Sequence, residues 1–279
     1  MKKKKTVKDH ILNILLVFFI LVFVGSGGYL GYYYWQINKS ESRADELEQK
    51  IENDDEFATE EFYYATAGDA EMGKEALSMY VEVDGKMILR KYSQLYADNT
   101  DFIGWLYIPG TKVGYPVMYT PEDEEFYLRK NYDKEYSTAG SLFISKYSDV
   151  VKPTDNVVIY GHNMKAGTMF HDLLNYQDES YYQEHKTVVF NTIYGNAEYE
   201  VIAAFQTNIK EVEDTSFKYY QFFDADTAAE FDEYVNNCKA LTPYDIPVTA
   251  KYGDKLITLS TCSYHTDEGR YVVVAKRVK

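Results

Sequence analysis

A cysteine and an arginine stand at the facing ends of two apolar runs near the C-terminus. The run Leu256–Thr261 ends on Cys262, and Arg270 opens the run Tyr271–Lys276. Seven residues, 263–269, separate the cysteine from the arginine, so a β-hairpin would bring a thiol and a guanidinium to the same rim of a sheet. A thiol becomes a good nucleophile when a positive group stabilises its thiolate or when a base removes its proton. The spacing therefore predicts nucleophilic chemistry beside a fixed positive charge.

Five histidines could supply the base. His162 is favoured because it follows the apolar run Asn156–Tyr160 and Gly161 in a turn, which places it at a strand end as Cys262 is. His265 is the rival, three residues from Cys262, but a loop tip is a poor platform for a positioned proton shuttle. The others are expected to be cytoplasmic (His10) or surface and structural residues (His171 and His185).

Each of these residues has a simpler explanation when it is taken alone. A lone cysteine in a strand is usually a packing residue, and Arg270 could form a weak surface pair with Asp267 or Glu268. The second cysteine, Cys238, lies in a helix-like stretch and is expected to be a small buried residue rather than a disulfide partner of Cys262. The combination of thiol, imidazole and guanidinium is what favours catalysis.

The elements that must position these residues are mostly short β-type runs bounded by Gly, Pro and Asn. Eight such runs predict a closed barrel or a sandwich: Phe102–Ile108, Tyr115–Met118, Ser141–Ile144, Asn156–Tyr160, Thr187–Asn191, Tyr199–Gln206, Lys255–Thr261 and Tyr271–Lys276. Helical patterns occur at Met87–Tyr96 and Met169–Leu174, and most clearly at Thr227–Leu241, for which Asp226 is the expected N-cap. The last helix lies in a long insertion between two strands.

An apolar segment near the N-terminus predicts a membrane anchor. Residues 11–31 carry no charged side chain and are long enough to cross a bilayer core. Five lysines precede them, so the positive-inside rule predicts a single-pass protein with residues 1–10 in the cytoplasm and the rest outside. The alternative is a cleaved secretory signal. The run continues into Tyr32–Trp35, an aromatic belt suited to the membrane interface, which favours a retained anchor over residues 11–35.

The charge of the chain divides at this anchor. The net charge is −15, and the first 35 residues hold five of the 29 basic but only one of the 44 acidic side chains. The remainder is therefore strongly acidic, which argues against a nucleic-acid partner and favours an amine-bearing one. Residues 36–84 have the composition of an acidic, solvated helical stalk and linker. Residues 85–279 are enough for one domain with its own core.

Three motifs in this order resemble those of the sortases, the cysteine transpeptidases of Gram-positive cell surfaces. They are the stretches Asp101–Trp105 with Ile108–Thr111, Tyr160–Met164, and Thr258–Cys262 followed by Arg270–Arg277. The similarity extends over most of residues 88–279. A helix inserted before the cysteine strand, here Thr227–Leu241, together with the N-terminal anchor, is similar to class B sortases. The resemblance implies a mainly β fold, an eight-stranded sortase-like β-barrel with peripheral helices behind one transmembrane helix.

The resemblance also implies a two-step acyl transfer. The Cys262 thiolate would attack the carbonyl of a threonine in a sorting motif near the C-terminus of a secreted protein, and His162 would protonate the departing amine. An amine of a cell-wall peptide would then attack the thioester. Arg270 would hold the oxyanion with the backbone N–H of Ser263, and Ser260 and Thr261 are further candidates for substrate contact. This chemistry requires no metal and no organic cofactor.

Other functions remain open at this point. A class B enzyme that polymerises pilins would share the same motifs, and a cysteine peptidase or cell-wall hydrolase would use the same Cys–His pair with water as acceptor. A non-enzymatic adhesin or scaffold would suit a chain with 29 tyrosines. Metal ligation has little support, because neither the histidine spacing nor the acidic clusters match a zinc or calcium motif.

Overall fold

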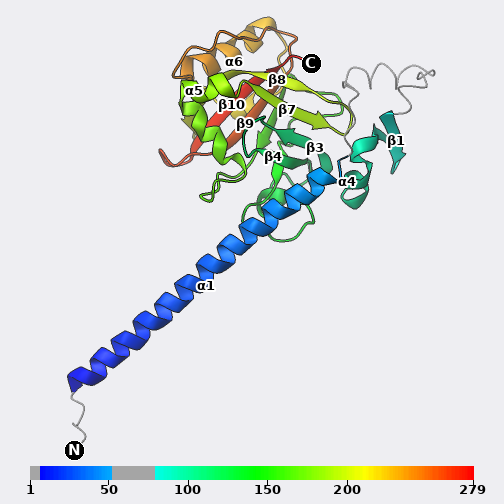
Figure 1. Cartoon of the computed structure of the whole chain (residues 1–279). Helices are drawn as coiled ribbons and strands as arrows, with labels where there is room; N and C mark the ends of the chain where they lie inside the picture. Colours follow the sequence, from blue (N-terminus) through cyan, green and yellow to red (C-terminus); the bar gives the residue numbers. More distant parts are fainter. Residues whose placement is uncertain (1–6, 52–78) are drawn as a thin grey trace, which may run out of the picture.

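The computed structural model describes residues 7–51 and 79–279, and its centre is a closed barrel of eight strands (Figure 1). Around the barrel the strands follow the order β10-β8-β7-β3-β4-β5-β6-β9. Their bounds are β3 Phe102–Tyr107, β4 Gly114–Met118, β5 Leu142–Ile144, β6 Asn156–Tyr160, β7 Thr187–Thr192, β8 Glu198–Asn208, β9 Leu256–Cys262 and β10 Gly269–Arg277. All eight predicted runs are strands, and the predicted barrel is confirmed.

The strand β9 has a different kind of neighbour on each edge. It pairs antiparallel with β10, where Cys262 lies opposite Arg270. It pairs parallel with β6, where Tyr160 lies opposite Ser260. Because parallel strands end at the same edge of a sheet, the segment that follows β6 emerges beside the end of β9.

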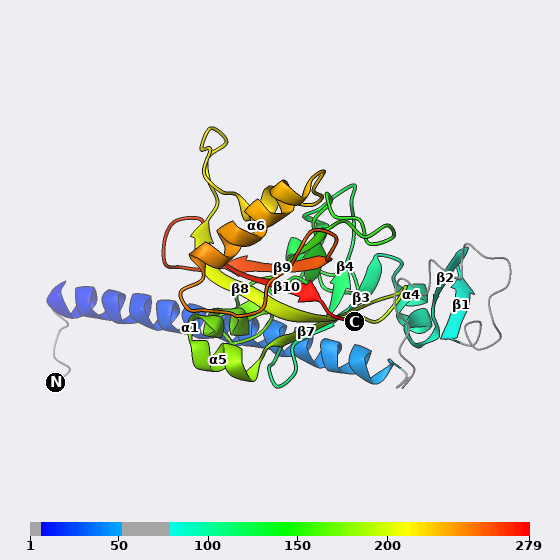
Figure 2. The same cartoon turned by 90° about the horizontal axis from the view of Figure 1, so that it is seen from above.

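The two faces of β9 pack against different clusters of side chains. Ile257 and Leu259 point into the main core of the barrel, which also contains Val273 of β10. Leu256 belongs to a second cluster that lies beneath α6, the helix Ala228–Leu241. In Figures 1 and 2 this helix covers the side of the barrel that faces away from α1. The strand that carries Cys262 is therefore buried on both faces.

The helix α6 begins one residue later than the sequence analysis predicts. Thr227 is the N-cap, and its side chain accepts a hydrogen bond from the backbone N–H of Glu230, whose carboxylate in turn accepts from the backbone N–H of Thr227. The expected N-cap Asp226 is wrong, because the side chain that caps the helix belongs to Thr227, and Asp226 contributes only its backbone N–H, which donates to Glu230. This Thr-x-x-Glu capping box satisfies two backbone donors at once, which a single Asp cap would not do.

The segment Met87–Tyr96 does not form the single helix predicted for it. It is divided among β2 Lys86–Leu89, the 3-10 turn η1 Arg90–Tyr92 and α4 Ser93–Asp98. β2 pairs with β1, Tyr80–Val83, around a turn in which Asp84 and Gly85 have φ of +50° and +77°. Asp-Gly is the sequence that such a hairpin turn favours. The hairpin straddles residue 85, where the sequence analysis places the start of the catalytic domain.

Four shorter helical segments lie between β4 and α6: η2 between β4 and β5, η3 and α5 between β6 and β7, and η4 between β8 and α6. They are 3-10 helices, η2 Phe126–Arg129, η3 Phe170–Gln177 and η4 Tyr219–Gln221, and the α-helix α5 Glu179–Glu184. The predicted helical run Met169–Leu174 corresponds to the start of η3, with Met169 just before it at a φ of +58°. Met169 also forms an isolated antiparallel bridge with Asn163, which closes the loop between β6 and η3.

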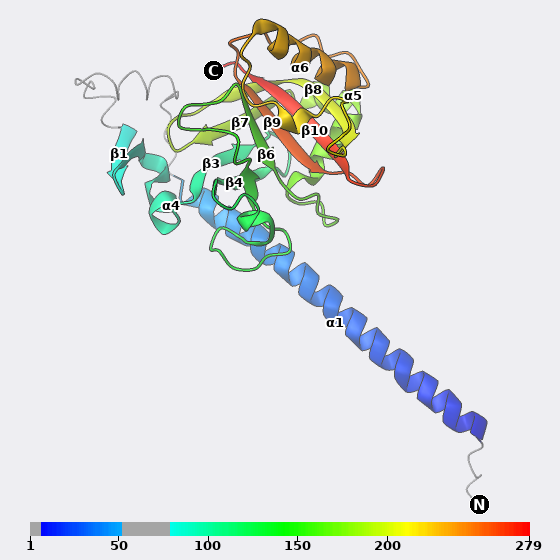
Figure 3. The same cartoon turned by 180° about the vertical axis from the view of Figure 1, so that it is seen from behind.

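The helix α1 is continuous over Val7–Gln49 and runs from the apolar segment onto the barrel (Figures 1 and 3). Its apolar window is long and hydrophobic enough to cross a membrane, and none of that window is buried inside the protein. The lysines before Val7 in the predicted basic tail lie outside the described residues. The helix does not end after Trp35, so the apolar segment and the barrel are joined by one continuous helix.

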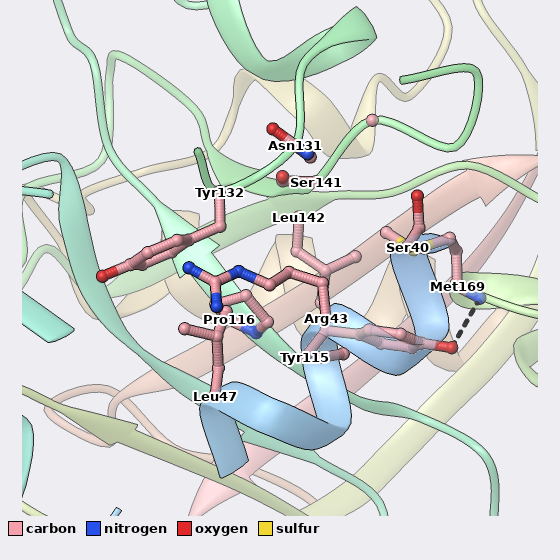
Figure 4. Close-up of a pocket in the computed structure, with 12 residues that line it drawn as sticks. Ser40, Arg43, Leu47, Tyr115, Pro116, Asn131, Tyr132, Ser141, Leu142 and Met169 are labelled. Atoms are coloured by element: carbon pink, nitrogen blue, oxygen red, sulfur yellow. Dashed lines mark hydrogen bonds between the residues drawn. The ribbon is translucent and has the colours of Figure 1, made fainter. Parts of the chain in front are cut away.

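The prediction of a solvated stalk is wrong for residues 36–49. Ile37, Ala44 and Leu47 of α1 are buried against the barrel core, and Arg43 forms a bidentate ion pair with Asp133 at 2.6 and 2.8 Å. Figure 4 shows Arg43 and Leu47 facing side chains of the barrel and its loops, among them Tyr115, Pro116 and Tyr132. One apolar stripe suffices to dock a helix on a preformed surface. The remaining stalk residues, 52–78, are outside the described part of the chain.

Leu47→Ala tests this docking. The side chain is 1% exposed, so its truncation should lower the free energy of unfolding of the full chain by roughly 2–5 kcal/mol. Denaturant unfolding in detergent measures the change, with Glu48→Ala on the exposed side of the same turn as the matched control. Equal stability of both variants would mean that the helix does not pack on the barrel.

Candidate active site

Cys262 is the last residue of β9 and is partly exposed at the rim of the barrel. Directly beyond it, the backbone N–H of Ser263 donates to the carbonyl of Gly269 at 2.8 Å, which closes the ladder between β9 and β10. A Cβ at position 269 would lie 2.1 Å from the Ser263 carbonyl oxygen, so this position requires glycine. The turn is therefore built to hold Cys262 and Arg270 side by side.

His162 lies two residues after β6, at the level of Cys262. The Gly161 N–H donates to the carbonyl of Ser260 at 3.1 Å, which extends the parallel ladder by one step toward the histidine. The Thr261 hydroxyl donates to the Gly161 carbonyl at 2.7 Å and ties the two strand ends together. A Cβ on Gly161 would come within 2.4 Å of the Leu142 side chain, so the chain passes through a space that a side chain cannot occupy.

The imidazole of His162 is oriented by a backbone group. Its Nε2 lies 2.8 Å from the carbonyl oxygen of Leu128 in η2. A carbonyl only accepts, so Nε2 carries the proton and Nδ1 is the nitrogen that can exchange one with a substrate. Burial of the ring lowers the pKa of His162 below its ordinary value, an effect that the Leu128 hydrogen bond opposes and the nearby charge of Arg129 reinforces. The neutral imidazole is therefore the favoured form at neutral pH.

The guanidinium of Arg270 lies on the same rim with its donors partly engaged. One nitrogen donates to the Gly269 carbonyl at 3.0 Å and another to the carboxylate of Glu268 at 3.2 Å. The surface pair considered as an alternative for Arg270 is thus present. The Glu268 side chain is 69% exposed, and an ion pair with so exposed a partner contributes little. It leaves the other guanidinium N–H groups for a substrate oxygen.

The three predicted residues line one groove with a volume of about 320 Å³. His162 comes from the segment after β6, Cys262 from the end of β9 and Arg270 from the start of β10. The floor and walls come from Glu124, Glu125, Leu128, Phe143, Tyr160, Gly161, Ile209, Ser260 and Thr261. The groove joins a thiol, an imidazole and a guanidinium, the set that acyl transfer through a thioester requires.

The three further candidates, two on β9 and one directly after it, already have intramolecular partners. The Ser260 hydroxyl pairs with that of Tyr219 at 2.7 Å, and both are buried. The Thr261 hydroxyl is bound to Gly161, and the Ser263 N–H expected to assist the oxyanion is bound to Gly269. In this arrangement these groups support the backbone around the groove, and Arg270 is the donor that faces it.

The other histidines and the second cysteine have structural surroundings. His265 lies on the exposed β9–β10 turn with Nδ1 2.9 Å from the Ser263 hydroxyl, and His185 has Nδ1 3.0 Å from the Pro109 carbonyl. Cys238 is fully buried in α6, its thiol is free, and burial raises its pKa. The prediction that Cys238 is a packing residue is confirmed.

Sequence reasoning missed Asn163 and the acidic wall of the groove. The Asn163 side-chain amide donates to the Cys262 carbonyl at 3.0 Å, and its oxygen accepts from Nδ1 of His171 at 2.8 Å. Asn163 thus bridges the His162 segment and the end of β9. Glu124 and Glu125 line the groove, although the sequence analysis considers the acidic clusters only as metal ligands and gives them no role. The one sequence feature that could have indicated Asn163 is that it directly follows the candidate histidine.

Comparison with known proteins agrees with this fold. The family model for the sortase domain matches residues 106–278. Sortase B of Listeria monocytogenes is 34% identical over 208 residues, covering 74% of this chain and 80% of that protein. Sortase B of Staphylococcus aureus is 28% identical over 191 residues, covering 68% of this chain and 75% of that protein.

Solved structures of class B sortases are also similar to this chain. A Staphylococcus aureus sortase B–substrate complex has a TM-score of 0.62 at 27% identity, covering 69% of this chain and 86% of that one. Bacillus anthracis sortase B in complex with AAEK1 has a TM-score of 0.61 at 29% identity, with the same coverage. The barrel and these matches together place the chain in the class of the cysteine transpeptidases. Within that class, the chain belongs to the sortase family and is similar throughout its barrel to class B.

Asn163→Ala tests whether the bridge between the two strand ends positions the groove. The variant loses both hydrogen bonds, and a displacement of about 1 Å between reacting groups costs roughly 10²-fold in rate. We expect kcat to fall by about that factor while the melting temperature stays near that of the parent. Lys165→Ala, exposed in the same loop, is the control. Unchanged kcat in Asn163→Ala would show that the bridge is not needed.

The titration of His162 tests the burial of its ring. Because the folded-state pKa lies below that of the unfolded chain, the protein should lose stability as the pH falls from the unfolded value through the lowered one. Nitrogen-15 NMR of the imidazole should give a midpoint below the ordinary histidine value. Arg129→Gln should raise that midpoint, since the Arg129 charge disfavours the imidazolium. A wild-type midpoint at or above the ordinary value would contradict this account.

Proposed function

We propose that this sortase is a membrane-anchored enzyme that cleaves a C-terminal sorting motif after threonine and transfers the cleaved protein to an amine of a cell-wall peptide. The observation that supports it most is the convergence of His162, Cys262 and Arg270 on one groove. A substrate complex is known for a relative, sortase B of Staphylococcus aureus. Secreted proteins with such a motif are the proposed substrates.

In the first step the Cys262 sulfur forms a bond to the threonine carbonyl carbon. The oxyanion is held by Arg270, and collapse of the tetrahedral intermediate breaks the C–N bond, with His162 giving its Nδ1 proton to the departing amine. A thioester remains. Because burial favours the neutral imidazole, only a minor fraction of the enzyme holds the thiolate–imidazolium pair, and this fraction reacts with the substrate.

In the second step an amine of the cell-wall acceptor attacks the thioester carbonyl carbon, a C–N bond forms and the C–S bond breaks. His162 takes up the amine proton and passes it to the departing sulfur, which regenerates the thiol. Glu124 and Glu125 line the groove, and their carboxylates would favour a positively charged amine there. A sortase B has been solved in complex with triglycine, which supports a peptide amine as acceptor for this chain as well.

The membrane part of the proposal rests on α1. Its apolar window meets the length and hydropathy of a spanning helix, and the lysines before it favour a cytoplasmic N-terminus. The barrel would then lie outside the cell, at the surface where sorting substrates emerge. A bilayer of ordinary thickness accommodates residues 11–31, and Tyr32–Trp35 fall at its outer interface.

The test is acylation followed by competition between water and an amine. The full chain is incubated with a library of sorting-type pentapeptides, and mass spectrometry identifies the one that acylates Cys262. An added peptide amine should then convert the hydrolysis product into a ligated product. Unchanged hydrolysis would favour a cysteine peptidase, ligation to a pilin lysine alone would favour a pilin polymerase, and no acylation would refute the assignment of Cys262.

Arg270→Ala, compared with Glu268→Gln, tests the role of the guanidinium. Loss of one oxyanion donor typically costs about 2.7–4 kcal/mol in the transition state, or roughly 10²–10³-fold in kcat. Glu268→Gln removes the surface ion pair and leaves the donor, so it should keep most activity. Thermal unfolding confirms that both variants fold. Equal losses in both would assign Arg270 to the ion pair instead of the oxyanion.

A further inference from the structure

The loop 131–138, which follows η2, runs alongside α1 toward the N-terminal end of that helix. Asp133 pairs with Arg43, Glu135 with Lys39 at 2.8 Å, and the Thr138 N–H and hydroxyl donate to Gln36 at 3.0 and 2.9 Å. From Arg43 to Gln36 the helix axis advances about 10 Å. The ion pairs and hydrogen bonds therefore fix the position of the loop along the helix axis, beside residues 36–43.

Tyr136 is the exposed aromatic residue of this loop. It shares a hollow of about 200 Å³ with Tyr32, Trp35 and Lys39 of α1, and its side chain is 65% exposed. A single exposed tyrosine is ordinary on a protein surface. What distinguishes Tyr136 is its place beside Tyr32 and Trp35, which are themselves 52% and 58% exposed.

The rise of the helix gives the position of this hollow relative to a bilayer that α1 would cross. If residues 11–31 fill a hydrocarbon core of about 30 Å, Tyr32 and Trp35 lie within about 6 Å of its outer edge. Tyr136, in the same hollow, then lies in the headgroup layer, where tyrosine and tryptophan rings are favoured because one side of the ring is apolar and the other polar.

The charges of the loop are compatible with this position. Asp133 and Glu135 are neutralised by Arg43 and Lys39 of α1, and Lys134 pairs with Asp101 at 2.8 Å. Although the domain as a whole is acidic, these charged side chains of the loop are paired, so the loop does not present an excess of negative charge. Contact through aromatic rings does not require anionic lipids, so a neutral bilayer is the appropriate probe.

We propose that the loop 131–138 is a second membrane-contacting element, with Tyr136 seated in the headgroup layer of a phospholipid bilayer beside Tyr32 and Trp35. This inference rests on the proposal that α1 is a membrane anchor. Two contacts, one spanning and one peripheral, would hold the barrel at a fixed tilt instead of letting it pivot on a single helix.

The β9–β10 turn lies on the same side of the barrel. In Figures 1, 2 and 3 the red turn between these strands projects in the direction in which α1 runs toward the N-terminus. Tyr264, two residues after Cys262, is 71% exposed on this turn. The fixed tilt would therefore keep the mouth of the catalytic groove close to the bilayer surface, within reach of substrates that are still embedded in it.

The test uses tryptophan emission of the full chain in phosphatidylcholine nanodiscs, with and without bromine on the acyl chains next to the headgroups. The natural tryptophans are Trp35 and Trp105, and Trp105 is buried in the barrel at 3% exposure, so it supplies a constant background. The reporter is Tyr136→Trp in a Trp35→Phe background. The matched control is Tyr252→Trp in the same background, because Tyr252 is 46% exposed and packs near α6 on the side away from α1.

We expect brominated lipid to quench the Tyr136→Trp reporter to the same degree as it quenches Trp35 of the wild type, and to leave the Tyr252→Trp control unchanged. Quenching of Trp35 without quenching of the reporter overturns the second contact and leaves the anchor intact. If Trp35 itself is not quenched, the anchor proposal fails and the inference fails with it. Quenching of the control would mean that the domain lies on the bilayer without a defined face, which also overturns the proposal. Peptide cleavage by each variant verifies that it folds.

Discussion

The pairing of β9 with β6 on one edge and with β10 on the other is the constraint on which the groove depends. Side chains along a strand alternate between faces, so a slip of one residue in either ladder would turn Cys262 to the opposite face of the barrel. The parallel ladder sets the level of His162, and the antiparallel ladder sets that of Arg270. Three residues that are up to 108 positions apart in sequence therefore meet because the register of β9 is fixed by a neighbouring strand on each edge.

Buried polar side chains help to specify that register. The Thr258 hydroxyl donates to Asn156 of β6 at 2.8 Å and pairs with the Tyr234 hydroxyl of α6 at 3.0 Å. Ser260 is paired with Tyr219 in the same way. Apolar residues at these positions would pack in several registers, whereas a buried hydroxyl that loses its partner costs free energy. The inserted helix α6 and its preceding segment thus stabilise the strand that carries the nucleophile from behind.

The sequence predicts the barrel and the three groove residues well because both depend on local signals. Short apolar runs between Gly, Pro and Asn mark strands, and a histidine, a cysteine and an arginine at strand ends stand out against them. The packing of α1 was missed because Ile37, Ala44 and Leu47 look sparse along the chain, although they form one stripe in space. The β1–β2 hairpin is not predicted because each of its strands is only four residues long, although Asp84 and Gly85 together encode its turn.

The role of Asn163 could not be predicted for a different reason. Its two partners, the Cys262 carbonyl and His171, are 99 and eight residues away, and no periodicity links them. The occupied N–H of Ser263 is likewise a property of the hairpin ladder and not of the residue type. Hydrogen-bond partners at a groove depend on how strands are brought together, which the order of residues alone does not reveal.

The unbroken course of α1 has a geometric consequence for how the chain can vary. An α-helix turns by about 100° and advances about 1.5 Å for each residue. One residue inserted between the apolar segment and Gln36 would therefore swing the whole barrel, groove included, about a third of the way around the helix axis, while seven would bring it back almost to its first azimuth but some 10 Å farther out. Lineages that lengthen this joint would be constrained to steps that complete whole turns.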